Sequence, residues 1–248
     1  MNEMSICKLC LEDKKLVDSH ILPEFLYSPL YDEEHRFSFL SMREGKVIKQ
    51  LKKGVYEKLL CEECDNIIIG QYENHAAKIL FGDGKKEIEI VRTNYGHLIK
   101  GADYKLFKLF QISLLWRVSI STRPEIKKIN LGPHQENMRL MLLDGLPGEV
   151  YEYGVWILLF PKSSKDLKDF ILIPQPLTRK IQGHRCFRAI FNCLCWLFFV
   201  SSHVQLFSHL GFFLSKTGEL PIVNSGEIGE NFVRYLAKEY QQNRNEDA

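Results

Sequence analysis

The spacing of hydrophobic residues predicts a small N-terminal module built around one helix. Residues 36–41 alternate between polar and apolar positions as a strand does, and residues 46–51 can pair with them after a turn. Pro23 is placed to open a short helix over residues 24–31. Further apolar residues recur at helical spacing up to about residue 81, at Ile67, Ile68, Tyr72, Ala76, Ile79 and Leu80. These elements predict a ββα-type module over residues 1–84.

The pattern changes after Gly82, and residues 85–240 predict a larger mixed domain. Asp103 is placed to cap a helix with a wide apolar face. Other elements are expected as a helix at 134–143, strands at 87–92, 155–160 and 170–173, an edge strand at 221–223, a final helix at 229–241 and a disordered tail at 241–248. Residues 187–200 fit two strands or one buried helix. The expected fold class is α+β.

Composition limits the kinds of partner that the chain can have. With 248 residues, 45% of them hydrophobic, it can bury one substantial core or two smaller ones. The net charge of +2 excludes a polycation, so contact with nucleic acid requires a local basic segment. Lys49, Lys52 and Lys53 form part of such a segment and are expected to contact phosphates. The alternative is a solvated hairpin face.

The sequence predicts a cytoplasmic protein without a membrane partner. The N-terminus lacks the basic and apolar segments of a signal peptide. The apolar stretch at 189–200 is shorter than the roughly 20 residues of a spanning helix. Cys186, Cys193 and Cys195 lie in this apolar region and are expected to be free thiols, as in a reducing compartment. A protein partner or a second copy of the chain would bind through the C-terminal domain.

Four further cysteines form two doublets of equal spacing, Cys7 with Cys10 and Cys61 with Cys64. Each C-x2-C turn directs two sulfur atoms to one point, so the four suit a tetrahedral zinc ion. A closed site of four sulfurs leaves no coordination position for water, so this zinc would be structural. The alternative is four reduced core thiols, for which two equal doublets would be unusual.

The segment between the doublets carries the sequence Ser19-His20-Ile21-Leu22-Pro23. The order C-x2-C, Ser-His-Ile-x-Pro, a hairpin, and Leu-Cys-x2-Cys at a helix start resembles the zinc-stapled HNH nucleases, also called His-Me finger or ββα-metal nucleases. The resemblance covers about residues 5–81. It implies a metal-dependent endonuclease that hydrolyses phosphodiester bonds in nucleic acid, with DNA rather than RNA as the expected substrate. By association, it also implies a role in bacterial defence against phage.

The resemblance also implies roles for single residues. His20 matches the general base of the family, and Asp65 occupies the place of a metal-binding helix residue. Asn66 is a second candidate ligand for a catalytic Mg or Mn ion, because carboxylate and amide oxygens can hold such an ion. The chain departs from the family in two places: Ser19 stands where many members have Asp, and Asp65 replaces the usual His. Without a catalytic role, His20 would fix a turn and Asp65 would favour the helix start.

Three functions follow from these residues. The first is an HNH-like nuclease, and the second is a non-catalytic zinc module that binds nucleic acid or a protein partner. The third is a regulatory subunit with its main site in the C-terminal domain. The positions of His20 and Asp65 distinguish the nuclease from the non-catalytic module, because a nuclease requires both side chains to face a common space. Trp116 and Arg117 are expected to pack and form ion pairs within the second domain.

Overall fold

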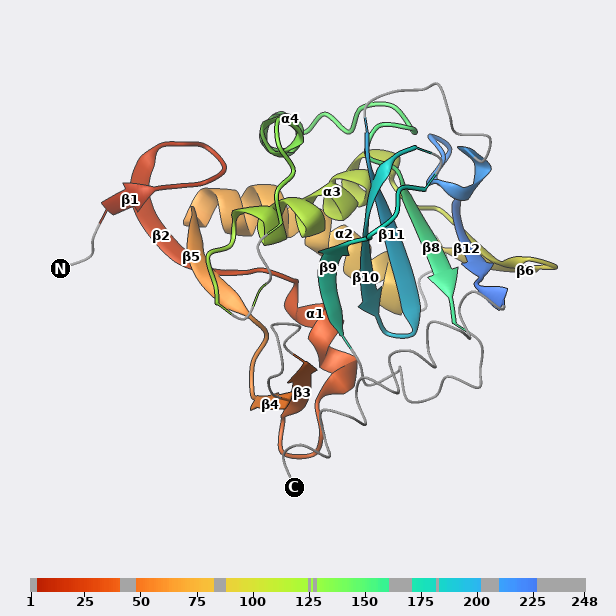
Figure 1. The fold of residues 1–248 in the computed structure, drawn as a ribbon, viewed down its shortest axis with the longest axis horizontal. Helices are drawn as coiled ribbons and strands as arrows, with labels where there is room; N and C mark the ends of the chain where they lie inside the picture. Colours follow the sequence, from red (N-terminus) through yellow and green to blue (C-terminus); the bar gives the residue numbers. More distant parts are fainter. Residues whose placement is uncertain are drawn as a thin grey trace.

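The computed structural model describes residues 4–40, 48–82, 88–124, 126, 129–160, 171–181, 183–201 and 210–226 (Figure 1). It contains both helices and sheets, so the predicted α+β class is confirmed. The predicted final helix and tail lie outside the described residues, as does the predicted boundary between residues 84 and 85. In the described part of the chain, no helix has the length and apolar character needed to cross a bilayer.

The N-terminal module is a small antiparallel sheet followed by a helix. Its strands are β1 (Met4–Ile6), β2 (Asp13–His20) and β5 (Tyr56–Cys61), in the order β1-β2-β5. From β5 the chain passes almost directly into a π-helical segment, η2 (Glu63–Ile69), which α2 (Gly70–Phe81) continues. The helix predicted after the second cysteine doublet is present, and that doublet lies where β5 meets η2. The two strands predicted for the module, at 36–41 and 46–51, do not belong to this sheet, whose strands β1, β2 and β5 the sequence pattern did not predict.

The connection between β2 and β5 contains two short elements and a hairpin. These are α1 (Glu24–Tyr27), a 3-10 turn η1 (Ser28–Leu30), and the antiparallel strands β3 (Phe37–Leu40) and β4 (Ile48–Leu51). Pro23 directly precedes α1, as predicted from its fixed φ. The α-helix itself ends after one turn and continues only as η1.

Seven strands form the large sheet, in the order β6-β7-β12-β8-β11-β10-β9. Their bounds are β6 (Glu89–Thr93), β7 (Gly96–Lys100), β8 (Val155–Leu159), β9 (Leu172–Pro176), β10 (Arg185–Phe191), β11 (Leu194–Val200) and β12 (Leu220–Asn224). A 3-10 turn, η4 (Leu210–Phe212), precedes β12. Neighbouring strands are antiparallel except for β8 and β12, which are parallel.

Residues 187–200 belong to two strands and not to a helix. β10 and β11 form a hairpin whose two linking residues, Asn192 and Cys193, have φ values of 50° and 64°. These left-handed values are those of a type I′ turn, which matches the twist of the paired strands. Along β11, Trp196 packs into one core and Leu197 into another on the opposite face. A continuous apolar run fits a strand here because both faces of the sheet are buried.

The expectation that residues 221–223 form an edge strand is wrong. β12 lies inside the sheet, between β7 and β8. Pro221 has no N–H to donate, but it precedes Ile222, the first residue that pairs with β8. A proline is tolerated at the start of such a ladder.

The helix α3 (Tyr104–Ile120) connects the small module with the large sheet (Figure 1). Asp103 accepts a hydrogen bond of 2.8 Å from the backbone N–H of Leu106, so the predicted cap is confirmed. α3 packs against α2 and α4 (His134–Asp144), and Phe107 lies against Trp196 of β11. It is apolar around most of its circumference because neighbours cover it on several sides. One continuous core therefore includes residues from both predicted domains.

Candidate metal centre and histidine cavity

The four doublet cysteines converge where β5 meets η2. Their sulfur atoms all lie within 4.8 Å of one another. A tetrahedral zinc ion, with Zn–S bonds of about 2.3 Å, requires sulfur atoms about 3.8 Å apart. Cys7, Cys61 and Cys64 are buried, and Cys10 is partly buried. The cluster could hold a structural metal ion such as zinc, as the spacing predicts.

The protonation of these thiols depends on burial and on backbone hydrogen bonds. Burial acts to raise the pKa of Cys7, but hydrogen bonds with the backbone of Cys10, Cys61 and Leu9 outweigh it and lower that pKa. One of these bonds joins the Cys61 N–H to the Cys7 sulfur at 3.3 Å. Burial raises the pKa of both Cys10 and Cys64. Metal binding to this cluster would therefore release protons from at least these two thiols.

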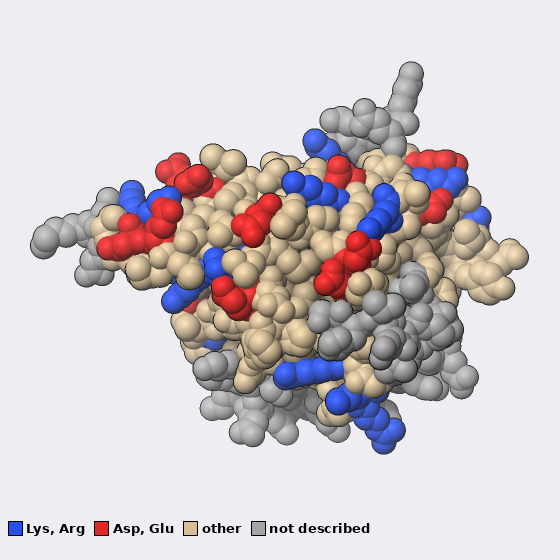
Figure 2. Space-filling view, turned by 90° about the horizontal axis from the view of Figure 1, so that it is seen from above, with Lys and Arg blue, Asp and Glu red and all other residues tan. Residues whose placement is uncertain are grey.

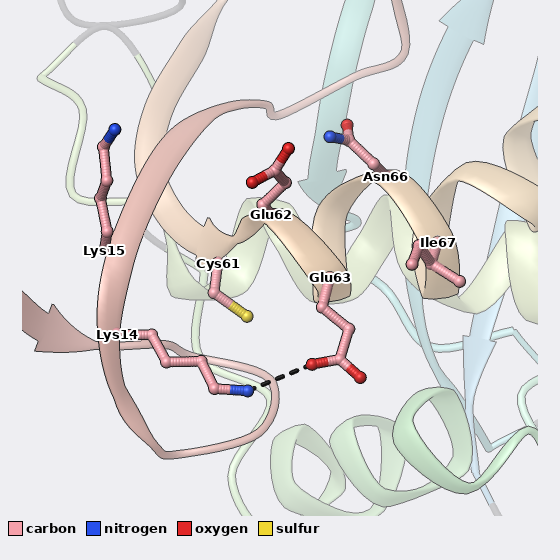
Figure 3. A pocket seen from close by; sticks show the side chains of 7 residues that line it. All are labelled: Lys14, Lys15, Cys61, Glu62, Glu63, Asn66 and Ile67. Atoms are coloured by element: carbon pink, nitrogen blue, oxygen red, sulfur yellow. Dashed lines mark hydrogen bonds and ion pairs between the residues drawn. The ribbon is translucent and has the colours of Figure 1, made fainter.

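Side chains from β2 and α4 hold the two cysteine doublets in place. Arg139 of α4 donates a hydrogen bond from Nη1 to the carbonyl oxygen of Leu9, inside the first doublet. Glu136 pairs with the same guanidinium at 2.7 Å. On β2, Lys14 pairs with Glu63 of η2 at 3.1 Å (Figure 3). The first doublet is thus held by a side chain that lies 130 residues away in the sequence.

His20 is the last residue of β2, and its partly exposed side chain lines a cavity of about 370 Å³. Its Nε2 lies 3.3 Å from Oε2 of Glu24 in α1. The ring also makes an edge contact with Tyr56, with ring centroids 6.2 Å apart. The remaining lining residues of this histidine cavity are Asp18, His35 and Lys53. A carboxylate beside one ring nitrogen orients an imidazole, which leaves the other nitrogen able to exchange a proton.

Asp65 is near His20 but does not line the histidine cavity. Burial raises the pKa of Asp65, while a hydrogen bond with Ser19 and the positive charges of Arg117 and His20 offset part of that rise. Ser19 is fully buried, and as the neighbour of His20 in β2 it faces the opposite side of the sheet. Asp65 is therefore held by groups behind the strand that carries His20.

Asn66 lines a different cavity, of about 610 Å³, on the exposed side of η2. Figure 3 shows this second cavity, with Asn66 and Ile67 on the outer surface of the helix and Lys14 paired with Glu63 below them. Neither Asp65 nor Asn66 lines the histidine cavity, although the charge of His20 contributes to lowering the pKa of Asp65.

The three predicted phosphate-binding lysines have different positions. Lys53 lines the histidine cavity, and Lys52 is exposed next to it in the chain. The side chain of Lys49 lies outside the described part of the structure. The face of the molecule in Figure 2 carries acidic and basic side chains interspersed, without a continuous basic stripe among the described residues. Of these lysines, Lys53 is the one that the structure places beside His20.

Two carboxylates of the histidine cavity were missed by sequence reasoning, although local signals for both were present. Glu24 follows His20 by four residues, and the turn at Pro23 brings the two side chains together. Asp18 precedes His20 by two residues in β2 and therefore lies on the same face. The alternation of side chains along β2 identifies Asp18, and the turn at Pro23 identifies Glu24.

Within the described residues, the four cysteines are the one group of three or more His, Cys, Asp or Glu side chains close enough to share an ion. Neither Asp65 nor the acids of the histidine cavity form a second group of this kind there. Comparison with protein-family models, with curated proteins and with solved structures finds no match.

Proposed function

We propose that this chain is an HNH-like endonuclease in which a zinc-stapled ββα module cleaves nucleic acid at the histidine cavity. The observation that supports the proposal is the position of His20. The imidazole is accessible at a strand end, a carboxylate lies 3.3 Å from its Nε2, and the second cysteine doublet lies at the far end of the paired strand. This arrangement combines a base with a scaffold that fixes it.

The residues of the histidine cavity suit the separate tasks of phosphodiester hydrolysis. His20 would accept a proton from the attacking water, because a positioned imidazole is the side chain that enzymes use most often as a general base. Glu24 would orient the ring, and Lys53 would attract a backbone phosphate. A bound Mg or Mn ion would offset charge on the scissile phosphate. Asp18, which lines the cavity, is the carboxylate that could contribute to holding it, whereas Asp65 lies behind β2 and would not reach the same ion.

The proposal is tested by incubating the zinc-loaded protein with supercoiled plasmid DNA and with single-stranded RNA, in the presence of Mg²⁺ or Mn²⁺. His20→Ala should reduce cleavage by about a hundredfold or more, the typical contribution of a general base. His97→Ala is the matched control, because His97 lies in β7 of the large sheet. Equal cleavage by wild type and His20→Ala, with equal zinc content, would remove the nuclease assignment.

A second candidate function, a non-catalytic zinc module, is favoured by the surroundings of Asp65. That carboxylate is hydrogen-bonded to Ser19 and lies near the charge of Arg117, so internal groups already satisfy it. A binding module would retain fluorescein-labelled DNA or RNA without cutting it, and its affinity would be unaffected by His20→Ala. Lys52→Glu combined with Lys53→Glu should weaken such binding and reduce its dependence on salt. Cleavage that requires His20 would exclude this function.

A further inference from the structure

Arg117 carries a buried positive charge from α3 into the N-terminal module. Its side chain is 1% exposed. The sequence-based expectation of an ion pair within the second domain is wrong, because the partners are Glu73 of α2 and the strand end at His20. The expectation failed because these partners are distant in the sequence and meet only through the packing of α3 against the module.

The contacts of Arg117 connect three elements. Nη1 donates a hydrogen bond of 2.8 Å to the carbonyl oxygen of His20 at the end of β2. The same nitrogen forms an ion pair of 2.6 Å with Glu73 in α2. Nε donates to the carbonyl oxygen of Ser113, one turn earlier in α3, at 3.4 Å. One cation therefore fixes the strand end, the module's helix and α3 relative to one another.

The hydrogen bond to His20 restrains the peptide group that follows the proposed base. The carbonyl oxygen of this group belongs to His20 and accepts from Arg117, while its N–H belongs to Ile21 and donates to the Val55 carbonyl oxygen at 2.8 Å. Both sides of one peptide plane are thus held, which fixes the backbone ψ angle of His20. Because Glu24 contacts the ring itself, the backbone and the imidazole are restrained independently.

Packing alone does not explain an arginine in this position. Nη2 is buried and has no hydrogen-bond partner among the described residues. A buried charge with an unmade hydrogen bond is less favourable than a well-packed apolar side chain of similar size. The specific contribution of the guanidinium is therefore its bond to the His20 carbonyl together with its charge beside Glu73 and Asp65.

We infer that Arg117 is a positioning residue for His20, acting from outside the zinc-stapled module. The role of His20 as a base rests on the proposed function, whereas the effect of Arg117 on the position of the His20 ring does not. Arg117 acts as an internal cation that sets the strand end, and it is not a substrate ligand, since it does not line the histidine cavity.

The experiment compares Arg117→Met and Arg117→Lys with wild type in the full, zinc-loaded chain. NMR signals of the His20 ring, assigned with His20→Asn, report on its position. Nicking kinetics report on its function. Arg117→Met should shift the ring signals and lower kcat by about a hundredfold with little change in KM, as expected for a misplaced catalytic group. Arg117→Lys keeps a charged hydrogen-bond donor. Its His20 ring signals and its kcat should therefore both lie between those of wild type and those of Arg117→Met.

Lys108→Met is the matched control, because Lys108 is also buried in α3 and donates to backbone carbonyl oxygens, but to those of Val150 and Tyr153 outside the module. It should leave the His20 ring signals unchanged. Unchanged ring signals in a folded Arg117→Met variant would overturn the inference. If Arg117→Met does not fold, Glu73→Gln provides the test instead, because it removes the carboxylate that forms the ion pair with Arg117. Unchanged His20 ring signals in Glu73→Gln would then overturn the inference. A wild type without nicking activity would refute the nuclease proposal, and the ring signals would still test the positioning.

Discussion

Lys108, in the N-terminal half of α3, is a second buried cation besides Arg117. It is 1% exposed, and its Nζ donates hydrogen bonds of 3.3 Å and 3.2 Å to the backbone carbonyl oxygens of Val150 and Tyr153. Burial lowers the pKa of Lys108 to about 7, and the charge of Glu152 offsets part of the decrease. The lysine thus ties the segment before β8 to α3, and its protonation state changes near neutral pH.

This arrangement predicts that the protein becomes more stable as the pH rises from 7. The unfolded chain keeps Lys108 protonated up to about pH 10.5, whereas the folded chain loses the proton near pH 7. Between these values the unfolded state binds more protons, so the free energy of unfolding increases with pH. The contribution should be about 2 kcal/mol between pH 7 and pH 9. Urea unfolding at both pH values measures it.

The difference between the two pH values should disappear in Lys108→Met. Lys105→Met is the matched control, because Lys105 is exposed on the same helix, one turn earlier. A Lys108→Met variant with the same pH dependence as wild type would show that other groups cause it.

At the scale of elements, the junction between α2 and α3 depends on one histidine. The Nε2 atom of His75, in α2, accepts a hydrogen bond of 2.9 Å from the backbone N–H of Asp103, the residue that caps α3. Only a neutral ring can accept this bond. Burial lowers the pKa of His75, and the nearby Asp103 carboxylate partly opposes that effect.

The junction should therefore weaken in acid. Because the folded-state pKa of His75 lies below its ordinary value of 6.5, the unfolded chain takes up the proton first as the pH falls. The contribution of His75 to stability is complete above pH 6.5 and is lost as the pH falls through the folded-state pKa. The melting temperature should decrease from pH 7.5 to pH 5, and His75→Asn should show a smaller decrease. His97→Asn, in β7, should behave like wild type in the same scan.

At the scale of the whole molecule, the metal centre and the large sheet share one core. Buried residues from Cys7 to Ile222 belong to the same hydrophobic cluster, and Arg139 connects α4 to the first cysteine doublet. A disturbance at the cysteines should therefore reach the C-terminal part, unlike in a protein whose zinc module folds separately.

Removal of the metal should destabilise the entire chain in one transition. Chelation of zinc, or Cys64→Ser, should lower the melting temperature by about 10 °C or more, because a structural metal contributes its binding free energy to folding. Near-ultraviolet circular dichroism of the aromatic core and zinc release, followed with a colour reagent, should change together. Cys193→Ser, in the β10–β11 turn, is the control. Two separate transitions would show that the parts unfold independently.

Features encoded by neighbouring residues could be predicted from the sequence. The two C-x2-C turns each place two sulfurs together, Asp103 caps the helix that follows it, and Pro23 begins α1. The helix after the second doublet also followed from local spacing, because each of these signals depends on residues less than about two turns apart. The strands β2 and β5, which pair across the module, did not follow from it.

Tertiary structure alone decided the features that require a distant partner. The apolar run in β11 is a strand because both faces of the large sheet are covered, and β12 is interior because β7 and β8 take both of its sides. Arg117 meets the carbonyl of His20 across 97 residues of sequence. The sequence by itself determined the two cysteine doublets and the helix that follows the second one, whereas the strand end at His20 was implied only by the resemblance to the HNH nucleases. Which cation holds the carbonyl group of that histidine depended on how α3 packs against the module, and no local pattern encodes such packing.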